Sequence, residues 1–288
     1  MAVFLPLPGN EALAASLASL TGGTLGRVET RRFPDGESYL RLHAELSGQE
    51  ALLVCTLDRP DAKLLPLLFA AATARRLGSP RVRLVAPYLA YMRQDAIFHP
   101  GEALASADFA ALISARFDGI VTVDPHLHRV HSLSSLYACP ATLVHAAPAL
   151  ARWIRENVRD PLVVGPDAES EQWAAGIAEA AGAPYLVFGK ERLGDRQVQL
   201  SVPDLRGRQE REPVLVDDIV SSGTTLAAAA DALREAGMRS PRCVVVHDLC
   251  RPQARRKLDG LTAGLISTNT VPGPTSRITV DALIARAL

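Results

Sequence analysis

The sequence has few cysteines and no arrangement of them that would cross-link the chain. Cys55, Cys139, Cys243 and Cys250 are scattered along 288 residues without a Cys-x-x-Cys pair. In a chain of this length, such usage excludes a disulfide framework and favours reduced thiols. We therefore expect a cytoplasmic protein, with Cys55 and Cys243 as core residues because both lie within apolar runs.

Long apolar runs and an excess of one charge are also missing. No stretch approaches the roughly 18–20 apolar residues of a membrane span, and the opening MAVFLPLPGN lacks the basic start and apolar length of a secretory signal. Lysine and arginine number 31, as do aspartate and glutamate, so no overall field attracts nucleic acid or anionic membrane. We expect neither partner, and local groups must hold any anionic substrate.

Short apolar runs alternate with helical patterns. The runs are bounded by proline, glycine or aspartate, as buried parallel strands often are. They cover residues 51–56, 82–86, 119–123, 162–165, 214–216, 243–247 and 264–268. The helical patterns cover residues 61–77, 106–116, 169–181 and 224–236. This alternation predicts an α/β fold with mostly parallel sheets flanked by helices.

The alternation runs through the chain twice, and the length suggests two domains. An alanine-rich stretch at residues 141–151 marks the break. We predict an N-terminal domain over residues 1–145 and a similar C-terminal domain over residues 146–288. No linker rich in glycine or serine separates them, so we expect the halves to pack tightly.

The most informative segment follows the run 214–216. Two adjacent carboxylates lead into a turn of small hydroxylated residues before an alanine-rich helix: Asp217, Asp218, Ser221, Ser222, Gly223, Thr224 and Thr225. The start of a helix presents unpaired N–H groups where a phosphate binds, and paired carboxylates can accept hydrogen bonds from a sugar diol. The pattern predicts a sugar-phosphate site.

A simpler interpretation is that the two carboxylates end a strand and that Thr224 or a nearby serine caps the helix. Capping, however, needs neither paired acids nor a Ser-Ser-Gly-Thr-Thr turn. The whole string resembles the phosphoribosyl pyrophosphate loop of the type I phosphoribosyltransferase fold.

Three further segments resemble the ribose-phosphate diphosphokinase family, in the same order along the chain. They are Arg-Phe-Pro-Asp-Gly-Glu at 32–37, Pro-Tyr-Leu-Ala-Tyr-Met-Arg-Gln-Asp at 87–95 with Pro-Gly-Glu at 100–102, and Asp-Pro-His at 124–126. The resemblance spans nearly the whole chain. It implies two phosphoribosyltransferase-like domains, and transfer of the diphosphoryl group of ATP to the anomeric hydroxyl of ribose 5-phosphate, which yields phosphoribosyl pyrophosphate and AMP.

Residues 32–37 suit the adenine of ATP, since Phe33 can stack on the base and Asp35 or Glu37 can accept from its amino group. Alone, this segment is equally well explained as an exposed turn. The resemblance places the adenine-side turn against a neighbouring subunit. It thus implies a homo-oligomer, a dimer or a multiple of dimers, with the ATP site at a subunit interface.

The resemblance assigns Arg93, Gln94 and Asp95 to the same nucleotide. A guanidinium suits phosphate oxygens, although a single loop arginine is more often plain surface. The segment then departs from the family, which has basic residues where this chain has Ala96-Ile97-Phe98-His99. That departure leaves phosphate activation and ADP inhibition open.

His126 and Asp167 are the expected metal ligands. Each follows an apolar run, at the end where α/β sheets bind ligands. His128 and His131 lie near His126, but their spacing matches no zinc pattern. The resemblance implies that His126 contacts the Mg²⁺–nucleotide complex and that Asp167 helps to hold metal and ribose. After Asp167 the family usually has glycines, whereas residues 168–173 read Ala-Glu-Ser-Glu-Gln-Trp.

Lys190 and Arg192 lie between Gly189 and Gly194, on an expected hairpin or flap. From the residues alone a solvated turn is the slightly better interpretation. The resemblance implies a mobile loop with a Lys-x-Arg pair, so that Lys190, Arg192 and His126 would be the catalytic residues.

Two alternatives stay open at this point. A phosphoribosyltransferase acting on a base would keep the 217–225 loop but would not need residues 33–37 or 93–95. A catalytically inactive regulatory homologue would tend to lose the catalytic charges, all of which this chain retains.

Overall fold

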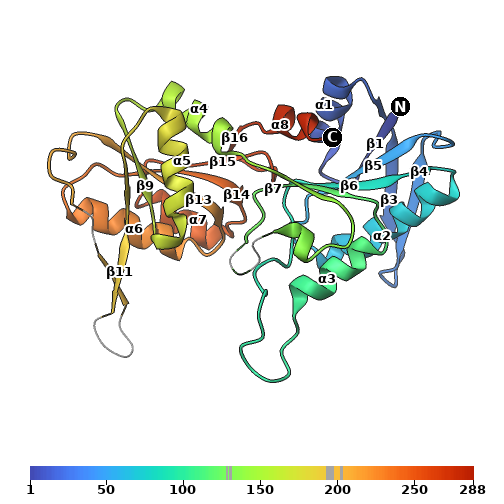
Figure 1. The fold of residues 1–288 in the computed structure, drawn as a ribbon, viewed down its shortest axis with the longest axis horizontal. Coiled ribbons are helices and arrows are strands. Elements are labelled where there is room, and N and C mark those ends of the chain that lie inside the picture. Colours follow the sequence, from blue (N-terminus) through green and yellow to red (C-terminus); the bar gives the residue numbers. More distant parts are fainter. Residues whose placement is uncertain (128, 130–131, 193–197, 202–203) are drawn as a thin grey trace. The chain divides into compact units, whose positions relative to one another are not determined.

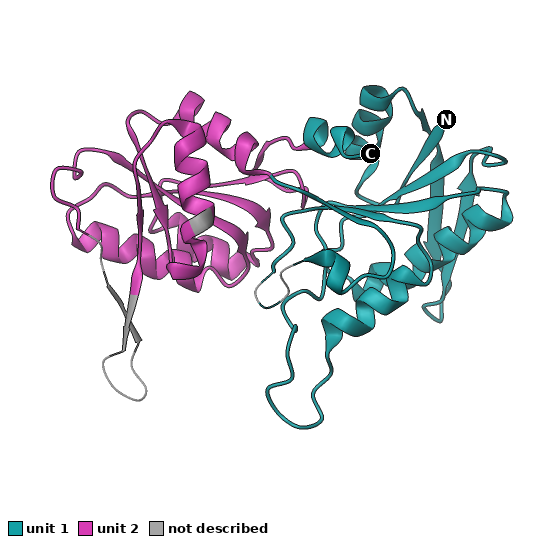
Figure 2. Ribbon diagram, in the orientation of Figure 1, with its two compact units in different colours: residues 1–145, 281–288 teal, residues 146–280 magenta. Residues whose placement is uncertain are grey.

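The computed structural model describes residues 1–127, 129, 132–192, 198–201 and 204–288. The chain forms two compact units, coloured separately in Figure 2. Unit 1 comprises Met1–His145 and Asp281–Leu288, and unit 2 comprises Ala146–Val280. The segment Asp281–Leu288, which the sequence placed in the C-terminal half, thus lies in unit 1.

Unit 1 is built on a parallel six-stranded sheet, in the order β2-β1-β5-β6-β7-β8 (Figure 1). Its strands are β1 (Ala2–Pro6), β2 (Thr24–Leu25), β5 (Glu50–Val54), β6 (Val82–Ala86), β7 (Ile120–Val123) and β8 (Ala141–Val144). Its helices are α1 (Glu11–Thr21), α2 (Asp61–Arg76), α3 (Ala105–Ser114), α8 (Asp281–Arg286) and the 3₁₀ turn η1 (Leu133–Ser135). An antiparallel hairpin, β3 (Arg27–Arg32) with β4 (Ser38–His43), is inserted between β2 and β5.

Unit 2 repeats this plan, with a parallel sheet in the order β10-β9-β13-β14-β15-β16. Its strands are β9 (Pro161–Gly165), β10 (Tyr185–Val187), β13 (Glu212–Val220), β14 (Arg242–Asp248), β15 (Leu265–Thr268) and β16 (Ser276–Ile278). Its helices are α4 (Ala147–Asn157), η2 (Ala168–Ser170, 3₁₀), α5 (Glu171–Ala181), α6 (Thr224–Glu235) and α7 (Pro252–Asp259). The hairpin β11 (Gly189–Arg192) with β12 (Val198–Ser201) occupies the position that β3–β4 has in unit 1.

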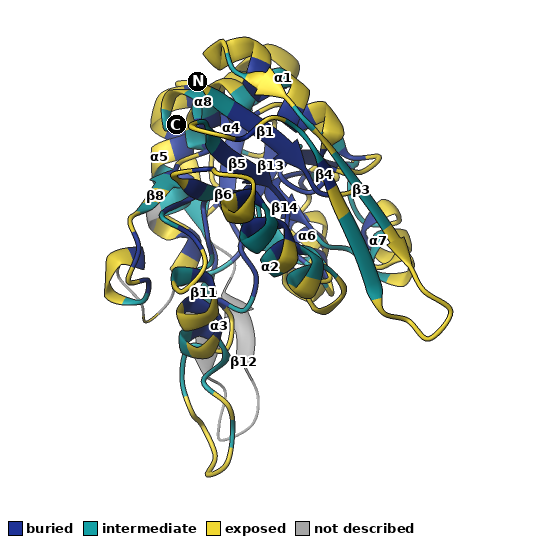
Figure 3. Cartoon of the chain, turned by 90° about the vertical axis from the view of Figure 1, so that its right-hand side faces the viewer, coloured by how far each residue is buried: buried dark blue, intermediate teal, exposed yellow. Residues whose placement is uncertain are grey.

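The strands form because their side chains are buried from both sides. Leu5, Leu53 and Leu84, on three adjacent strands of unit 1, are fully buried, and strands such as β5 and β13 are dark in the burial view of Figure 3. Each such side chain contributes about 1.5–3 kcal/mol by leaving water. Continuous apolar strands covered on both faces are the expected signature of a parallel sheet.

All seven apolar runs predicted to be strands are strands, so that prediction is confirmed. The sequence analysis did not predict strand β1. It considered these residues only as a possible secretory signal, whereas in the structure they form a strand between β2 and β5. The helix expected from residue 169 begins at Glu171, after η2. No helix within the described residues is long and apolar enough to cross a membrane.

At the amino ends of β6 and β7 in unit 1, Asp118 connects α2 to β6 by hydrogen bonds. Its Oδ2 accepts hydrogen bonds from the Val82 backbone N–H at 2.7 Å and from Arg75 Nη2 at 3.0 Å. Burial raises the pKa of Asp118, but the hydrogen bonds from Val82 and Arg75 and the charge of Arg75 outweigh it, so the pKa lies below its usual value. The folded state therefore favours the ionised carboxylate.

We expect Asp118→Asn to lower the melting temperature at pH 7, with a difference that shrinks in acid. A lowered carboxyl pKa stabilises the fold above the unfolded value of about 3.9, and this contribution is lost as the pH falls through the folded pKa. Thermal unfolding of both proteins between pH 7 and pH 3 measures it. A difference in melting temperature that is independent of pH would contradict the assignment.

Candidate active site

The paired carboxylates lie on β13, near its carboxyl end. The sequence analysis predicted a strand that ends in the two carboxylates, and this is wrong in its end point: β13 continues past them to Val220. Ile219 and Val220 pair with His247 and Asp248 of β14, which extends the ladder past the carboxylates. Asp217 and Asp218 are each half-buried at the edge of the sheet where parallel α/β folds bind ligands.

Three carboxylates crowd this edge. Burial raises the pKa of Asp217 well above its usual value, and the charge of Asp218, a side-chain hydrogen bond with Asp218 and the charge of Asp167 raise it further. The Asp218 backbone N–H, which donates to Asp217 Oδ1 at 3.0 Å, opposes the shift. A cation or a set of hydroxyl donors would relieve this repulsion, so the site is suited to bind one or both.

The loop between β13 and α6 places hydroxyl groups at the start of a helix. Ser222 Oγ accepts a hydrogen bond from the Thr224 hydroxyl at 3.1 Å and a longer one from the Thr224 N–H at 3.4 Å. Helix α6 begins at Thr224, and the first N–H groups of any helix have no intrahelical partner. Ser221 and Thr225 complete the loop, with Thr225 exposed on the first turn. The arrangement can hold an anion such as a phosphate.

Gly223 is required in this loop for two reasons. Its φ is +68°, in the left-handed region that favours glycine. A Cβ at this position would lie 3.1 Å from Leu258 Cδ1 and 3.2 Å from Leu258 Cγ, a side chain of α7. The loop therefore packs directly against α7.

Asp167 caps η2 in a reciprocal arrangement with Ser170. The Ser170 N–H donates to Asp167 Oδ1 at 3.2 Å, and the Asp167 N–H donates to Ser170 Oγ at 3.3 Å. A Cβ on Gly165 would come within 2.5 Å of Ser170 Oγ, so the turn packs tightly on the end of β9. The departure from the family pattern at residues 168–173 is thus a capped helix start that fixes the backbone of Asp167.

Lys190 and Arg192 lie on β11, the first strand of the unit 2 hairpin. In the antiparallel register, Lys190 is opposite Leu200 and Arg192 is opposite Val198. The side chains of both residues lie outside the described part of the chain. Their catalytic assignment stays a prediction.

In unit 1, the predicted adenine-binding residues form the tip of the β3–β4 hairpin, which is exposed in Figure 3. Phe33 is 39% exposed, and the Arg31 guanidinium carbon lies 4.5 Å from the centroid of its ring. Asp35 Oδ1 accepts the Glu37 N–H at 3.1 Å and closes the turn. The hairpin thus presents an aromatic face and two carboxylates on the surface of unit 1.

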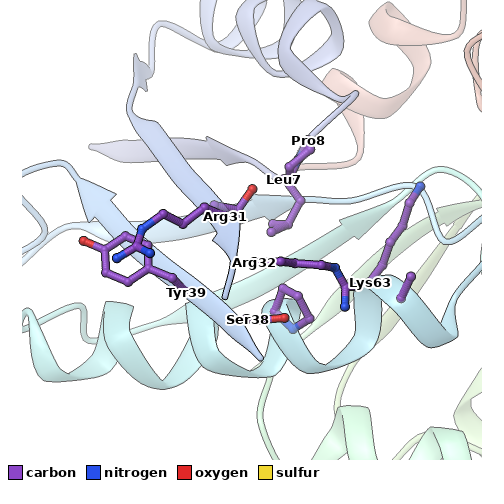
Figure 4. A pocket seen from close by; sticks show the side chains of 10 residues that line it. Leu7, Pro8, Arg31, Arg32, Ser38, Tyr39 and Lys63 are labelled. Atoms are coloured by element: carbon purple, nitrogen blue, oxygen red, sulfur yellow. The ribbon is translucent and has the colours of Figure 1, made fainter. Parts of the chain in front are cut away.

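A cavity of about 230 Å³ lies beside this hairpin (Figure 4). It is lined by Leu7, Pro8, Thr30, Arg31, Arg32, Ser38, Tyr39, Ala62, Lys63 and Pro66. Lys63 Nζ is paired with Asp58 Oδ1 at 2.5 Å, and the Arg31 guanidinium stacks on Tyr39 at 4.2 Å. Arg32 Nη1 donates to the Gly36 carbonyl at 3.1 Å, so each of the three cations that line the cavity already has a partner within the chain.

Arg93, Gln94 and Asp95 follow the buried Met92 in unit 1, and the first two are exposed. Asp95 is different: its side chain is 4% exposed and accepts hydrogen bonds from the Arg129 N–H at 3.1 Å and Arg129 Nη1 at 2.9 Å. Burial raises the pKa of Asp95, but these hydrogen bonds and the charge of Arg129 outweigh it and lower the pKa. Asp95 therefore anchors the loop after β7, and no sequence signal joined it to Arg129.

His126 is half-buried in that same loop. Two residues earlier, Asp124 has a φ of +31°, and its Oδ1 is 3.0 Å from His145 Nδ1. The hydrogen bond and charge of Asp124 raise the pKa of His145 despite partial burial. His128 and His131 lie outside the described residues. The sequence analysis did not identify His145, which follows β8.

The two predicted metal ligands belong to different units, His126 to unit 1 and Asp167 to unit 2. Within the described residues, no group of three or more histidine, cysteine, aspartate or glutamate side chains could hold a metal ion. Mg²⁺ is ordinarily bound through one or two carboxylates together with substrate phosphates and water. The crowded carboxylates of unit 2 fit that mode.

We expect Gly223→Ala to destabilise the protein more than Gly182→Ala, by about 1–3 kcal/mol, because it adds a close contact to the same backbone strain. Gly182 is a matched control in unit 2: its φ is +70°, and an added Cβ would meet nothing within 4 Å. Urea unfolding of both variants measures the difference. Equal losses of stability would show that Leu258 does not press on the loop.

Two family models match the chain. The N-terminal domain of ribose phosphate pyrophosphokinase matches residues 2–116, and the phosphoribosyl transferase domain matches residues 132–268. A solved structure, phosphoribosylpyrophosphate synthetase from Mycobacterium smegmatis, superposes with a TM-score of 0.85 over 99% of this chain and 96% of that one. At 23% identity it shows the fold: two phosphoribosyltransferase-like domains.

Curated relatives extend the match over nearly the full length. Ribose-phosphate pyrophosphokinase from Methanobrevibacter smithii is 32% identical, with 96% of each chain covered. The enzyme of the same name from Methanothermobacter thermautotrophicus is 34% identical with 96% of each chain covered, and that from Saccharolobus solfataricus is 34% identical over 89% of this chain and 88% of its own. The chain belongs to the ribose-phosphate pyrophosphokinase family.

Proposed function

We propose that the protein is a ribose-phosphate diphosphokinase, which transfers the β,γ-diphosphoryl group of ATP to the anomeric hydroxyl of ribose 5-phosphate and releases phosphoribosyl pyrophosphate and AMP. The observation that carries this proposal is the paired-carboxylate and hydroxyl loop of unit 2 within a chain that matches ribose-phosphate pyrophosphokinases over 96% of its length. A phosphoribosyltransferase acting on a base is disfavoured, since the N-terminal family model is specific to the pyrophosphokinases.

Ribose 5-phosphate is proposed to bind at the carboxyl end of β13. Asp217 and Asp218 accept hydrogen bonds from the ribose diol, whose donors relieve the crowding of the carboxylates. The loop of Ser221, Ser222, Gly223, Thr224 and Thr225 holds the 5-phosphate at the start of α6. Both ends of the sugar are fixed, which orients the anomeric hydroxyl for attack.

ATP is proposed to bind through Arg93 and Gln94, with Phe33, Asp35 and Glu37 of a neighbouring subunit around the adenine. The exposed hairpin tip supports this, because it offers an aromatic face at the surface of unit 1. Asp95 contributes indirectly: its carboxylate accepts hydrogen bonds from Arg129 and so holds the loop that carries His126. The proposal requires a homo-oligomer, a dimer at least. It places the protein in the cytoplasm, where both substrates occur.

Mg²⁺ is the proposed cofactor, held by Asp167 and His126 together with the substrate phosphates. When bound, it would neutralise charge that develops on the transferred group. Lys190 and Arg192 are proposed to close over the diphosphoryl group and donate to its non-bridging oxygens. Phosphoryl transfer passes through a loose transition state that depends on positioning and charge more than on a general base.

The test is to incubate the purified protein with Mg²⁺, ATP and ribose 5-phosphate and to measure AMP and phosphoribosyl pyrophosphate together. We expect equal amounts of both products.

Lys190→Ala should lower turnover by about 10²-fold or more with little change in substrate binding, because the lysine acts in the transition state.

Each outcome discriminates among the alternatives. ATP binding without AMP formation would identify an inactive regulatory homologue. No ATP binding by the folded protein would favour a transferase. Normal turnover by Lys190→Ala would remove Lys190 from the catalytic set and leave the overall reaction intact.

A further inference from the structure

Helix α7 supports the sugar-phosphate loop but has little apolar packing of its own. Of its eight residues, all described, one side chain is buried: Leu258, which lies directly beneath Gly223. The remaining residues of Pro252–Asp259 are exposed or half-buried, and four are charged. A single buried leucine is little apolar packing for a helix of eight residues, so apolar packing alone holds this helix weakly.

A salt bridge between Arg255 and Asp248 attaches α7 to the sheet. Arg255 Nη2 of α7 donates to Asp248 Oδ2 at 2.6 Å, and the Asp248 side chain is 3% exposed. The same carboxylate accepts the Cys250 N–H at 2.9 Å and the Thr275 hydroxyl at 2.5 Å. Thr275 in turn lies 2.9 Å from the Ser267 hydroxyl of β15. Asp248 thus joins α7 to the end of the sheet through charge-assisted hydrogen bonds.

The Asp248–Arg255 ion pair lies next to the start of the 221–225 loop. Asp248 is paired in register with Val220, the residue before Ser221, and the Leu249 N–H donates to the Val220 carbonyl at 2.8 Å. Arg255 and Leu258 are three residues apart on α7, a spacing that places both on one side of a helix. Arg255 therefore attaches α7 to the end of β14. Leu258, on the same side of α7, packs against the loop at Gly223.

We infer that Arg255 and Asp248 are positioning residues for ribose 5-phosphate binding: their ion pair holds α7 so that Leu258 keeps the 221–225 loop in its phosphate-binding shape. Neither residue belongs to the loop or to the paired carboxylates. The inference rests on the proposed function, because it assigns the loop to the sugar phosphate. It predicts an effect confined to one of the two substrates.

The test compares Arg255→Met with Arg211→Met. Arg211 is the matched control: its Nη1 makes an ion pair of the same 2.6 Å length with Asp160, but before β13 and β9, at the amino end of the same sheet. We expect Arg255→Met to raise the KM for ribose 5-phosphate about tenfold, since small misplacements of a binding group are costly. The KM for ATP should stay within about twofold for both variants.

Two further variants guard against a simple folding defect, because removal of Arg255 leaves a buried carboxylate without its partner. Arg255→Lys keeps the charge and should restore most of the affinity for ribose 5-phosphate. The double variant Asp248→Asn/Arg255→Gln removes both charges and keeps a hydrogen-bonded pair, so it should fold and give an intermediate KM.

The outcomes separate this inference from the proposed function. If wild-type protein neither binds ribose 5-phosphate by calorimetry nor turns it over, the proposed function fails. If wild type is active and Arg255→Met shows an unchanged KM for ribose 5-phosphate, or equal rises for both substrates, the positioning role is overturned while the proposed function stands.

Discussion

The crowding of three carboxylates at the end of β13 is the constraint on which the site of unit 2 depends. Burial raises the pKa of Asp217 well above its usual value, and the neighbouring charges of Asp218 and Asp167 raise it further. A fold under selection for stability alone would not gather them. The ligand proposed for this site would bring hydroxyl donors and a cation to the same place. The capped start of η2, the glycine at 223 and α7 pack around that arrangement.

Unit 1 shows what the same sheet edge looks like without this constraint. Its strands follow the same order, and β5 corresponds to β13, yet β5 is followed by Cys55-Thr56-Leu57-Asp58 rather than by paired aspartates. Asp58 is neutralised internally by Lys63. The two units thus differ at the same sheet edge: unit 2 has crowded carboxylates there, whereas in unit 1 Asp58 is paired with Lys63.

Much of the fold and the position of the loop before a helix could be predicted from the sequence, because apolar strands and the Asp-Asp and Ser-Ser-Gly-Thr-Thr string are local signals. Strand β1 was missed because it is a run of only five residues, Ala2–Pro6, that ends at a proline, and it was considered only as a possible secretory signal. The pairs Asp95–Arg129, Asp124–His145 and Asp248–Arg255 could not be predicted. Each of the first two joins residues more than 20 positions apart, and the third looks like ordinary surface charge until α7 is seen to bury one leucine.

The most direct test of this account is thermal unfolding at neutral pH of wild type and Asp217→Asn/Asp218→Asn, each with and without ribose 5-phosphate. Because a raised folded-state carboxyl pKa means that ionisation destabilises the fold, the free variant should melt at a higher temperature than free wild type. It should nevertheless gain less from saturating ribose 5-phosphate, since ligand stabilisation follows affinity. A free variant that melts lower, or an equal gain from the sugar phosphate, would contradict the claim that these carboxylates are gathered for the ligand.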